Sequence, residues 1–358
     1  MNKLKIYKKI ASIVIIGFII FSIYLVYDAS NVWAEYKFND EYYYLKRQLI
    51  YGLLAIISYF IARKIDILKY KKYFIPILIV CNILLVLVLI PGIGIMKGGS
   101  YSWLGFSFLS FQPSEIYKLS LITFTSYFLD KYYLKIKSIK HIIPLLIVLL
   151  VGAILIMLQP DFGTLVVIFS SVVVLLFLTK IKLSYFFVGG FFVVVIGIVM
   201  ILIEPYRIDR IISFVDPFKD PLGSGFQIIQ SLFAIGPGGL LGQGLNSSIQ
   251  KYYYLPEPQT DFIFAILVEE FGLIGGVITI LMYFYLFYIL FKIAKLKNNQ
   301  FNFLLSMGLL SLVVIQVVIN LGVVTSLFPV TGITLPFLSY GGSSLIMLSF
   351  SMGLIVGE

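Results

Sequence analysis

The sequence has little charge, one cysteine and one histidine, and each shortage excludes a class of protein or site. Lys, Arg, Asp and Glu make up only 12% of the 358 residues, which is too little charge to cover a soluble domain of this size. The single cysteine, Cys81, excludes a disulfide within the chain and a cysteine-based metal site. The single histidine, His141, excludes a histidine cluster. The sequence is therefore not that of a soluble enzyme.

Apolar residues make up 60% of the chain, and its mean hydropathy is +1.02. Apolar runs of about 18 residues or more are long enough to cross a bilayer as helices. Such runs predict an all-α polytopic membrane protein, a single integral membrane domain over 1–358 with about ten transmembrane helices. The predicted spans are roughly 10–27, 47–62, 74–92, 114–129, 141–158, 163–179, 184–203, 262–291, 303–324 and 337–356.

Basic residues gather on one side of the predicted spans. The N-terminus and the even-numbered connections hold 18 Lys and Arg side chains, whereas the odd-numbered connections hold eight, together with eleven Asp and Glu. Because Lys and Arg concentrate in cytoplasmic loops, the first side is predicted to be cytoplasmic, and an even number of spans places both termini there. The net charge of +10 is then a signal of topology rather than a nucleic-acid patch, so no nucleic acid is expected as a partner.

One connection on the outer side, 204–261, is much longer than a link between helices requires, and such loops are usually functional or disordered. Its aromatic residues and Gly-Pro punctuation do not suit disorder. We expect the loop to fold over the outer mouth of the bundle. Within it, 227–235 predicts a short amphipathic helix lying at the membrane interface.

Charged residues occur where a bilayer makes them costly. Glu115 and Lys118 share one face of the fourth predicted span because they are three residues apart, and Glu269 and Glu270 lie in the eighth. One interpretation places Glu115, Lys118 and Glu269 in a cavity open to the outer side. The other is a structural ion pair that holds spans four and eight together, with Glu270 protonated.

Asp261 ends the long loop at the mouth of the eighth predicted span. A carboxylate at a boundary between water and membrane suits a general base. A Thr-Asp pair just before an apolar run is also an ordinary helix start. Spacing alone favours the helix cap.

A glycine-rich stretch at 236–244 lies in the same outer loop. It lacks the Lys-Ser/Thr ending of a nucleotide-binding P-loop. Two readings stay open: a contact to a lipid pyrophosphate with Arg207 and Arg210 nearby, or a re-entrant turn. Trp103, in the second outer connection, suits either an interfacial anchor or a face that stacks on a sugar.

Several strings occur together in a fixed order along almost the whole chain. They are Phe111-Gln112-Pro113-Ser114-Glu115, Gln159-Pro160-Asp161-Phe162-Gly163, Tyr206-Arg207-Ile208-Asp209-Arg210 with Phe214-Val215-Asp216-Pro217-Phe218, Pro256-Glu257 with Thr260-Asp261-Phe262, and Leu335-Pro336-Phe337-Leu338-Ser339-Tyr340-Gly341-Gly342-Ser343-Ser344. In these strings the chain resembles the SEDS family of shape, elongation, division and sporulation proteins. The stretches 210–218 and 330–334 look more like its FtsW/SpoVE branch than its RodA branch.

The resemblance implies a peptidoglycan glycosyltransferase that polymerises lipid II on the outer face of the bacterial cytoplasmic membrane. It implies a class B penicillin-binding transpeptidase as a partner, with other membrane proteins of the division or elongation complex. The family's essential aspartate maps onto Asp261, which replaces the helix cap as the favoured reading. The competing functions are a lipid II flippase and a non-catalytic division scaffold.

Two positions depart from the family pattern. Gln259 stands where family members carry a histidine, and Ser102 stands where a basic residue usually precedes the tryptophan. A histidine base is thus missing. The pyrophosphate contacts would come from Arg207, Arg210, Lys97 or a divalent cation, Mg or Mn, for which no ligand cluster is evident. The candidate substrate-binding residues are Lys97, Trp103, Arg207, Arg210, Glu257, Gln259, Thr260, Ser339 and Ser343.

Overall fold

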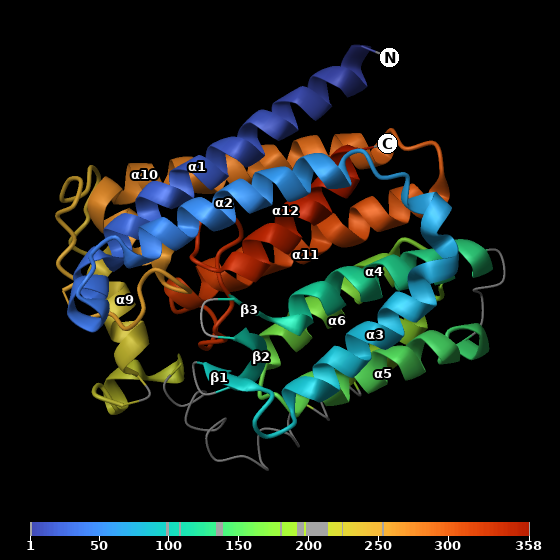
Figure 1. Ribbon diagram of the computed structural model, residues 1–358, viewed down its shortest axis with the longest axis horizontal. Coiled ribbons are helices and arrows are strands. Elements are labelled where there is room, and N and C mark those ends of the chain that lie inside the picture. The colour runs from blue at the N-terminus through green and yellow to red at the C-terminus, as the bar shows by residue number, and fades with distance from the viewer. Residues whose placement is uncertain are drawn as a thin grey trace.

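A computed structural model describes residues 2–97, 100–106, 109–133, 139–179, 181–191, 197, 214–223, 225–252 and 254–357. This part of the chain is mostly helical, and its long helices run side by side in one bundle (Figure 1). The main helices are α1 (Asn2–Phe38), α2 (Tyr43–Ala62), α3 (Phe74–Val88), α4 (Pro113–Tyr132), α5 (Ile143–Met157), α6 (Phe162–Phe177), α9 (Phe226–Ile235), α10 (Ile263–Lys295), α11 (Gln300–Val324) and α12 (Gly342–Val356), with 3-10 turns η1 (Ile67–Tyr73), η2 (Ile139–His141) and η3 (Pro217–Lys219).

The bundle is that of a polytopic membrane protein. Among the residues that the structure describes, five helical stretches are long and apolar enough to cross a membrane, namely those at 3–38, 43–62, 67–88, 263–295 and 300–324. Helices α5, α6 and α12 are apolar but shorter. The predicted span 184–203 lies largely outside the described residues, so the number of spans stays a prediction. Both termini lie at one end of the bundle, and α9 lies at the opposite end (Figure 1).

Two helix boundaries differ from the predicted spans. Helix α1 extends over 37 residues, because the sequence after its apolar run contains no glycine or proline to end it. Helix α12 begins at Gly342 instead of 337, because Phe337 has a left-handed φ of 68° and lies in a turn. The helix predicted at 227–235 is confirmed as α9, and its Ser231 hydroxyl donates to the Val324 carbonyl of α11 at 2.8 Å.

A small antiparallel sheet, which the sequence reading missed, interrupts the helices after α3. It consists of β1 (Ile95–Lys97), β2 (Ser100–Phe106) and β3 (Leu109–Phe111), in the order β1-β2-β3. Trp103 of β2 pairs with Ile95, and Leu104 pairs with Phe111. The sheet lies toward the end of the bundle opposite the termini (Figure 1). It therefore places the Trp103 segment at the same end as the long loop.

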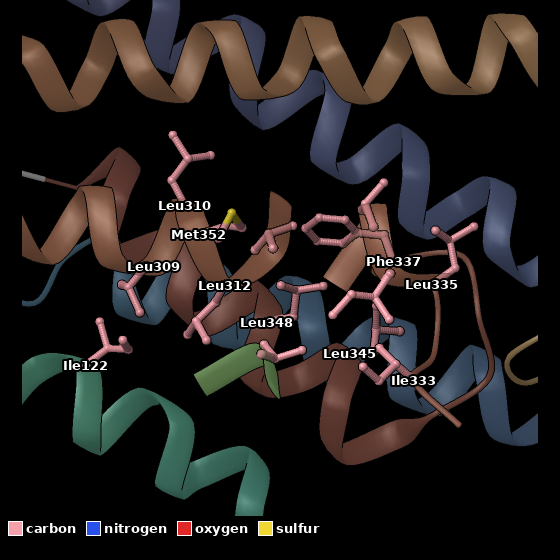
Figure 2. Close-up of a cluster of buried hydrophobic side chains, with 14 of the residues drawn as sticks. Ile122, Leu309, Leu310, Leu312, Ile333, Leu335, Phe337, Leu345, Leu348 and Met352 are labelled. Carbon is pink, nitrogen blue, oxygen red and sulfur yellow. The ribbon is translucent and has the colours of Figure 1, made fainter. Parts of the chain in front are cut away.

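Apolar packing between α4, α11 and α12 forms the centre of the bundle. Figure 2 shows Ile122, Leu309, Leu312 and Leu348 gathered there, and all four side chains are buried. In a membrane such contacts stabilise by close packing rather than by release of water. Helix α12 also lies along α2, where a Cβ at Gly353 would be 2.4 Å from the Tyr59 carbonyl. This packing fixes the outer ends of α4, α11 and α12 relative to one another.

Helix α10 is broken near its outer end. Gly272 has φ 70° and ψ −172° inside the helical stretch, a conformation open to glycine but not to residues with a Cβ. The segment before the break, 263–271, carries Glu269 and Glu270, and Asp261 lies just before it. The N-terminal segment of α10 is thus a short, separate helix that bears Glu269 and Glu270 and directly follows the turn with Asp261.

Candidate functional site

Asp261 lies in the turn that leads into α10 and is partly exposed. The Thr260 hydroxyl donates to its carboxylate at 2.8 Å, and the Asn320 amide donates to its backbone carbonyl at 2.7 Å. The same Asn320 amide nitrogen donates to the Ile333 carbonyl at 2.8 Å. The N-cap residue of α10 is Phe262, and it makes no side-chain capping bond. The assigned N-cap of α10 thus comes one residue after Asp261.

The turn before α12 meets the Asp261 loop. The Tyr340 backbone amide donates to the Gln259 backbone carbonyl at 2.8 Å. The Tyr340 ring contacts the Tyr44 ring edge to face, with 4.9 Å between the ring centroids. The Gln259 side chain is buried, and its Oε1 atom accepts no hydrogen bond from the described residues. Glu257 turns the chain three residues earlier with a positive φ of 45°. The structure thus gathers Glu257, Gln259 and Thr260 around the Asp261 turn.

An arginine that the sequence reading overlooked lies at the same mouth. The Arg47 guanidinium of α2 stacks over the Tyr43 ring at 4.3 Å from its centroid and lies close to the Tyr340 side chain. The signal for Arg47 was its place in an outer connection that holds few cations. The sequence alone does not reveal this place at the mouth, because Tyr340 comes from a segment far away along the chain.

The other substrate-binding candidates are spread out. The Ser339 hydroxyl accepts from the Leu335 amide at 2.8 Å, which closes a turn. The Ser343 hydroxyl accepts from the Gln112 backbone amide at 3.4 Å and so joins the starts of α12 and α4. Trp103 is partly buried on β2. Lys97 ends β1. Arg207 and Arg210 lie outside the described residues, and their proposed contacts stay predictions.

The ion pair inside the bundle is local to one helix. Lys118 and Glu115 of α4 pair at 2.9 Å, with side chains that are 7% and 11% exposed. The expectation of an ion pair between spans four and eight is wrong, because the Glu269 carboxylate binds elsewhere. Glu115 and Lys118 line a small cavity of about 20 Å³ with Gln316 and Ser351 among its walls, which is enough for one water molecule.

A partly buried carboxylate, Asp161, lies near this pair. It is the N-cap of α6, where it accepts from the Thr164 amide at 3.0 Å and from the Gln112 side chain at 3.1 Å. Burial raises the pKa of the Asp161 carboxyl, and the charge of Glu115 adds to the rise while that of Lys118 opposes it. The Gln-Pro-Asp string marked this residue in the sequence but gave it no role.

Glu269 and the glycine-rich loop are structural partners of the break in α10. The Glu269 carboxylate accepts from the Ser248 hydroxyl at 2.6 Å and from the Ile249 amide at 2.8 Å. The Gln243 and Gly244 amides donate to the backbone carbonyls of Glu269 and Glu270 at 2.9 and 3.1 Å. These two amides are therefore engaged within the protein, and the pyrophosphate reading of 236–244 stays a prediction for the rest of the stretch.

The same loop also caps the second half of α10. The Leu273 amide donates to the Gly239 carbonyl at 2.8 Å, which satisfies a donor left free by the helix break. A Cβ at Gly242 would lie 2.0 Å from the Glu270 carbonyl oxygen. Gly242 is therefore needed for close backbone contact, which favours the re-entrant turn reading.

No metal site is evident in the part of the chain that the structure describes, since no three His, Cys, Asp or Glu residues gather there as ligands. The divalent cation expected from the sequence therefore has no ligand set among the described residues and stays a proposal.

Comparison with known proteins supplies the family. A family model described as Cell cycle protein, FtsW/RodA/SpoVE, matches residues 8–357. The chain is 45% identical to stage V sporulation protein E of Bacillus subtilis, over 93% of this chain and 91% of the relative. It is 38% identical to a probable peptidoglycan glycosyltransferase FtsW of Trichlorobacter lovleyi, over 98% and 92%. Both relatives are consistent with the FtsW/SpoVE branch.

Solved structures agree in fold. A chain from a study of structural coordination of polymerization and crosslinking by a peptidoglycan synthase complex matches with a TM-score of 0.77 and 28% identity, over 96% of this chain and 95% of that one. The rod shape determining protein RodA of Thermus thermophilus matches with a TM-score of 0.70 and 24% identity, over 97% and 94%. The chain belongs to the FtsW/RodA/SpoVE family of cell cycle proteins.

Proposed function

We propose that this protein is a peptidoglycan glycosyltransferase that polymerises lipid II at the outer face of the bacterial cytoplasmic membrane, with Asp261 as its general base. The observation that carries the proposal is the Asp261 turn itself. Its carboxylate is partly exposed, accepts from Thr260 and lies one residue before the assigned N-cap of α10. Relatives that match almost the whole chain carry the name peptidoglycan glycosyltransferase.

The reaction asks little covalent chemistry of the protein. The sugar 4-hydroxyl of the acceptor attacks the anomeric carbon of the donor, the new glycosidic bond forms, and the bond to the lipid pyrophosphate breaks. One displacement turns an α-pyrophosphate into a β-linkage, so no enzyme nucleophile is needed. Asp261 takes the proton of the attacking hydroxyl. The enzyme must also orient the two sugars and neutralise charge on the leaving pyrophosphate.

Cations near the mouth would bind that pyrophosphate. Arg47 is the arginine that the described structure places beside the Asp261 turn, next to the Tyr43 and Tyr340 side chains. A guanidinium fork matches two phosphate oxygens at once. Arg207, Arg210 and Lys97 are the further donors proposed from the sequence. A divalent cation could add charge neutralisation, with substrate phosphates among its ligands.

The proposed setting follows from the same comparisons. One structural relative comes from a peptidoglycan synthase complex that coordinates polymerization and crosslinking, which supports a class B penicillin-binding transpeptidase as the partner here. Other membrane proteins of the division or elongation complex would join it. The concentration of Lys and Arg in one set of connections supports cytoplasmic termini, and both termini lie at one end of the bundle.

Replacement of Asp261 tests the function directly. Asp261→Asn keeps the shape of the side chain but removes the proton acceptor, which should lower the rate about 10²–10⁴-fold. Asp261→Glu moves the base by one methylene, and misplacement by about 1 Å can cost about 10²-fold. The measurement is polymerisation of labelled lipid II by the purified protein with its transpeptidase partner and a divalent cation.

A matched control is Asp40→Asn, because Asp40 is a carboxylate at the outer end of the bundle that pairs with the exposed Lys46. It should leave polymerisation unchanged. Near-normal glycan synthesis by Asp261→Asn would remove Asp261 from the chemistry. The flippase and scaffold functions would then become the better explanations.

A further inference from the structure

A buried lysine joins three separate parts of the outer end of the molecule. The Lys251 ammonium of the long loop lies 2.8 Å from Asp28 of α1 and 3.4 Å from Glu270 of α10. It also donates to the Asn246 side chain at 2.6 Å. The side chains of Lys251, Asp28 and Glu270 are 0%, 2% and 1% exposed. The proposed reaction uses none of them.

The charges of this Lys251 cluster do not balance. One ammonium faces two carboxylates, and the second oxygens, Asp28 Oδ2 and Glu270 Oε2, are buried without a hydrogen-bond partner among the described residues. Removal of the one cation from such a cluster would leave buried like charges facing each other, which is the costly way to break a buried pair. Removal of one carboxylate would instead leave a balanced pair.

The short helix 263–271 connects the Lys251 cluster to Asp261. Glu270 and Asp261 stand near opposite ends of the short outer helix 263–271, which ends at the break at Gly272. Glu269, next to Glu270, binds the loop at the Ser248 hydroxyl. The loop then runs from Lys251 to Asp261 over ten residues. A shift of the loop or of α1 at Lys251 would therefore tilt the segment that carries the base.

We propose that Lys251 is a positioning residue of the transferase: by tying α1 and the long loop to the outer segment of α10, it holds Asp261 at the distance the acceptor hydroxyl requires. The inference rests on the proposed function. Its effect is on alignment, so it appears in the rate of the chemical step rather than in the binding of lipid II.

Lys251→Met in the purified full chain is the first test. Loss of alignment by about 1 Å should lower kcat about 10²-fold, with a change in KM of less than about threefold. Lys251→Arg keeps the charge and the donors and should recover part of kcat. Asp28→Asn leaves one carboxylate for one ammonium and should change kcat less than about threefold. Lys46→Met, which removes an exposed lysine paired with Asp40, is the matched control and should have normal kcat.

The double variant Lys251→Met/Asp28→Asn separates positioning from stability. It restores the net charge of the wild-type cluster and so should fold even where Lys251→Met does not, yet it lacks the tie and should keep a low kcat. A cluster that only stabilises the fold predicts normal kcat for the folded double variant. That result, or normal kcat in Lys251→Met, would overturn the proposal.

Hydrogen–deuterium exchange gives a readout that does not depend on catalysis. Loss of the Lys251 tie should speed exchange across 254–261 and leave α11 and α12 unchanged. Full polymerisation by Asp261→Asn would defeat the proposed function and leave this exchange result standing. Unchanged exchange in Lys251→Met would defeat the positioning proposal alone.

Discussion

Two helices of the bundle carry ionisable side chains into apolar surroundings, and they use them differently. Helix α4 pairs Glu115 with Lys118 inside a single turn, beside a small cavity between α4, α11 and α12. Helix α10 gives Glu269 to the backbone of the long loop and Glu270 to Lys251. The Glu115–Lys118 pair lies within one helix, whereas Glu269 and Glu270 connect α10 to the long loop.

The difference shows that charged side chains within a span can have different structural roles. A pair satisfied by its own helix leaves its remaining hydrogen-bonding capacity to the cavity it lines, as Glu115 and Lys118 do. Carboxylates that bind loop amides are parts of the fold, and their removal would release the loop. We therefore expect changes at the outer end of α10 to disturb structure more than changes in α4.

The largest effect is expected at the joint between the loop and α10. Gly242→Ala would place a Cβ 2.0 Å from the Glu270 carbonyl oxygen, at a φ of 81°. The clash and the strained backbone should together cost about 3 kcal/mol or more. Gly239→Ala is the control, because Gly239 has a φ of 54° but open space around its Cβ position; it should cost only about 1–2 kcal/mol. Equal thermal stability of the two purified variants would contradict a close backbone contact between the loop at Gly242 and α10.

A double-mutant cycle gives the next largest effect and tests the comparison itself. Lys118→Met and Glu115→Gln should couple by about 1–2 kcal/mol, because the two side chains are in contact. Lys118→Met and Glu269→Gln should be additive within about 0.5 kcal/mol. The measurement is thermal unfolding of the single and double variants in one detergent. Coupling between Lys118 and Glu269 would instead support an ion pair between α4 and α10.

The sequence predicted what depends on neighbours along the chain. Apolar runs located the helices, and spacing of three placed Glu115 and Lys118 on one face. It could not choose the partner of Glu269, because Ser248 and Ile249 reach it only through the fold of the loop. The same limit hid Arg47 and Lys251, whose partners lie on other elements. The β-sheet around Trp103 was missed because its three strands are short.

The smallest effect concerns the carboxylate that α4 and α6 share. Burial raises the pKa of Asp161, so the folded protein binds a proton there more tightly than the unfolded chain does. This group should therefore raise the free energy of unfolding as pH falls through its folded pKa, and lower it at higher pH. Asp161→Asn still accepts from the Thr164 amide, and the Gln112 amide can turn its oxygen toward the new NH₂ group.

We expect Asp161→Asn to raise the Tm by about 1–2 °C at high pH and to lose that advantage as pH falls through the raised pKa and the wild-type carboxyl becomes neutral. Asp40→Asn should show the opposite trend. The Lys46 hydrogen bond holds the pKa of Asp40 below its usual value, so the contribution of Asp40 is present above the unfolded pKa and is lost as pH falls. Thermal unfolding of both variants and the wild type makes the comparison, over a pH range that extends from pH 8 to below 3.8, the ordinary pKa of an aspartate. An Asp161→Asn advantage that grows as pH falls would show that Asp161 is ionised in the folded protein, held by Lys118 and Gln112 rather than neutralised by burial.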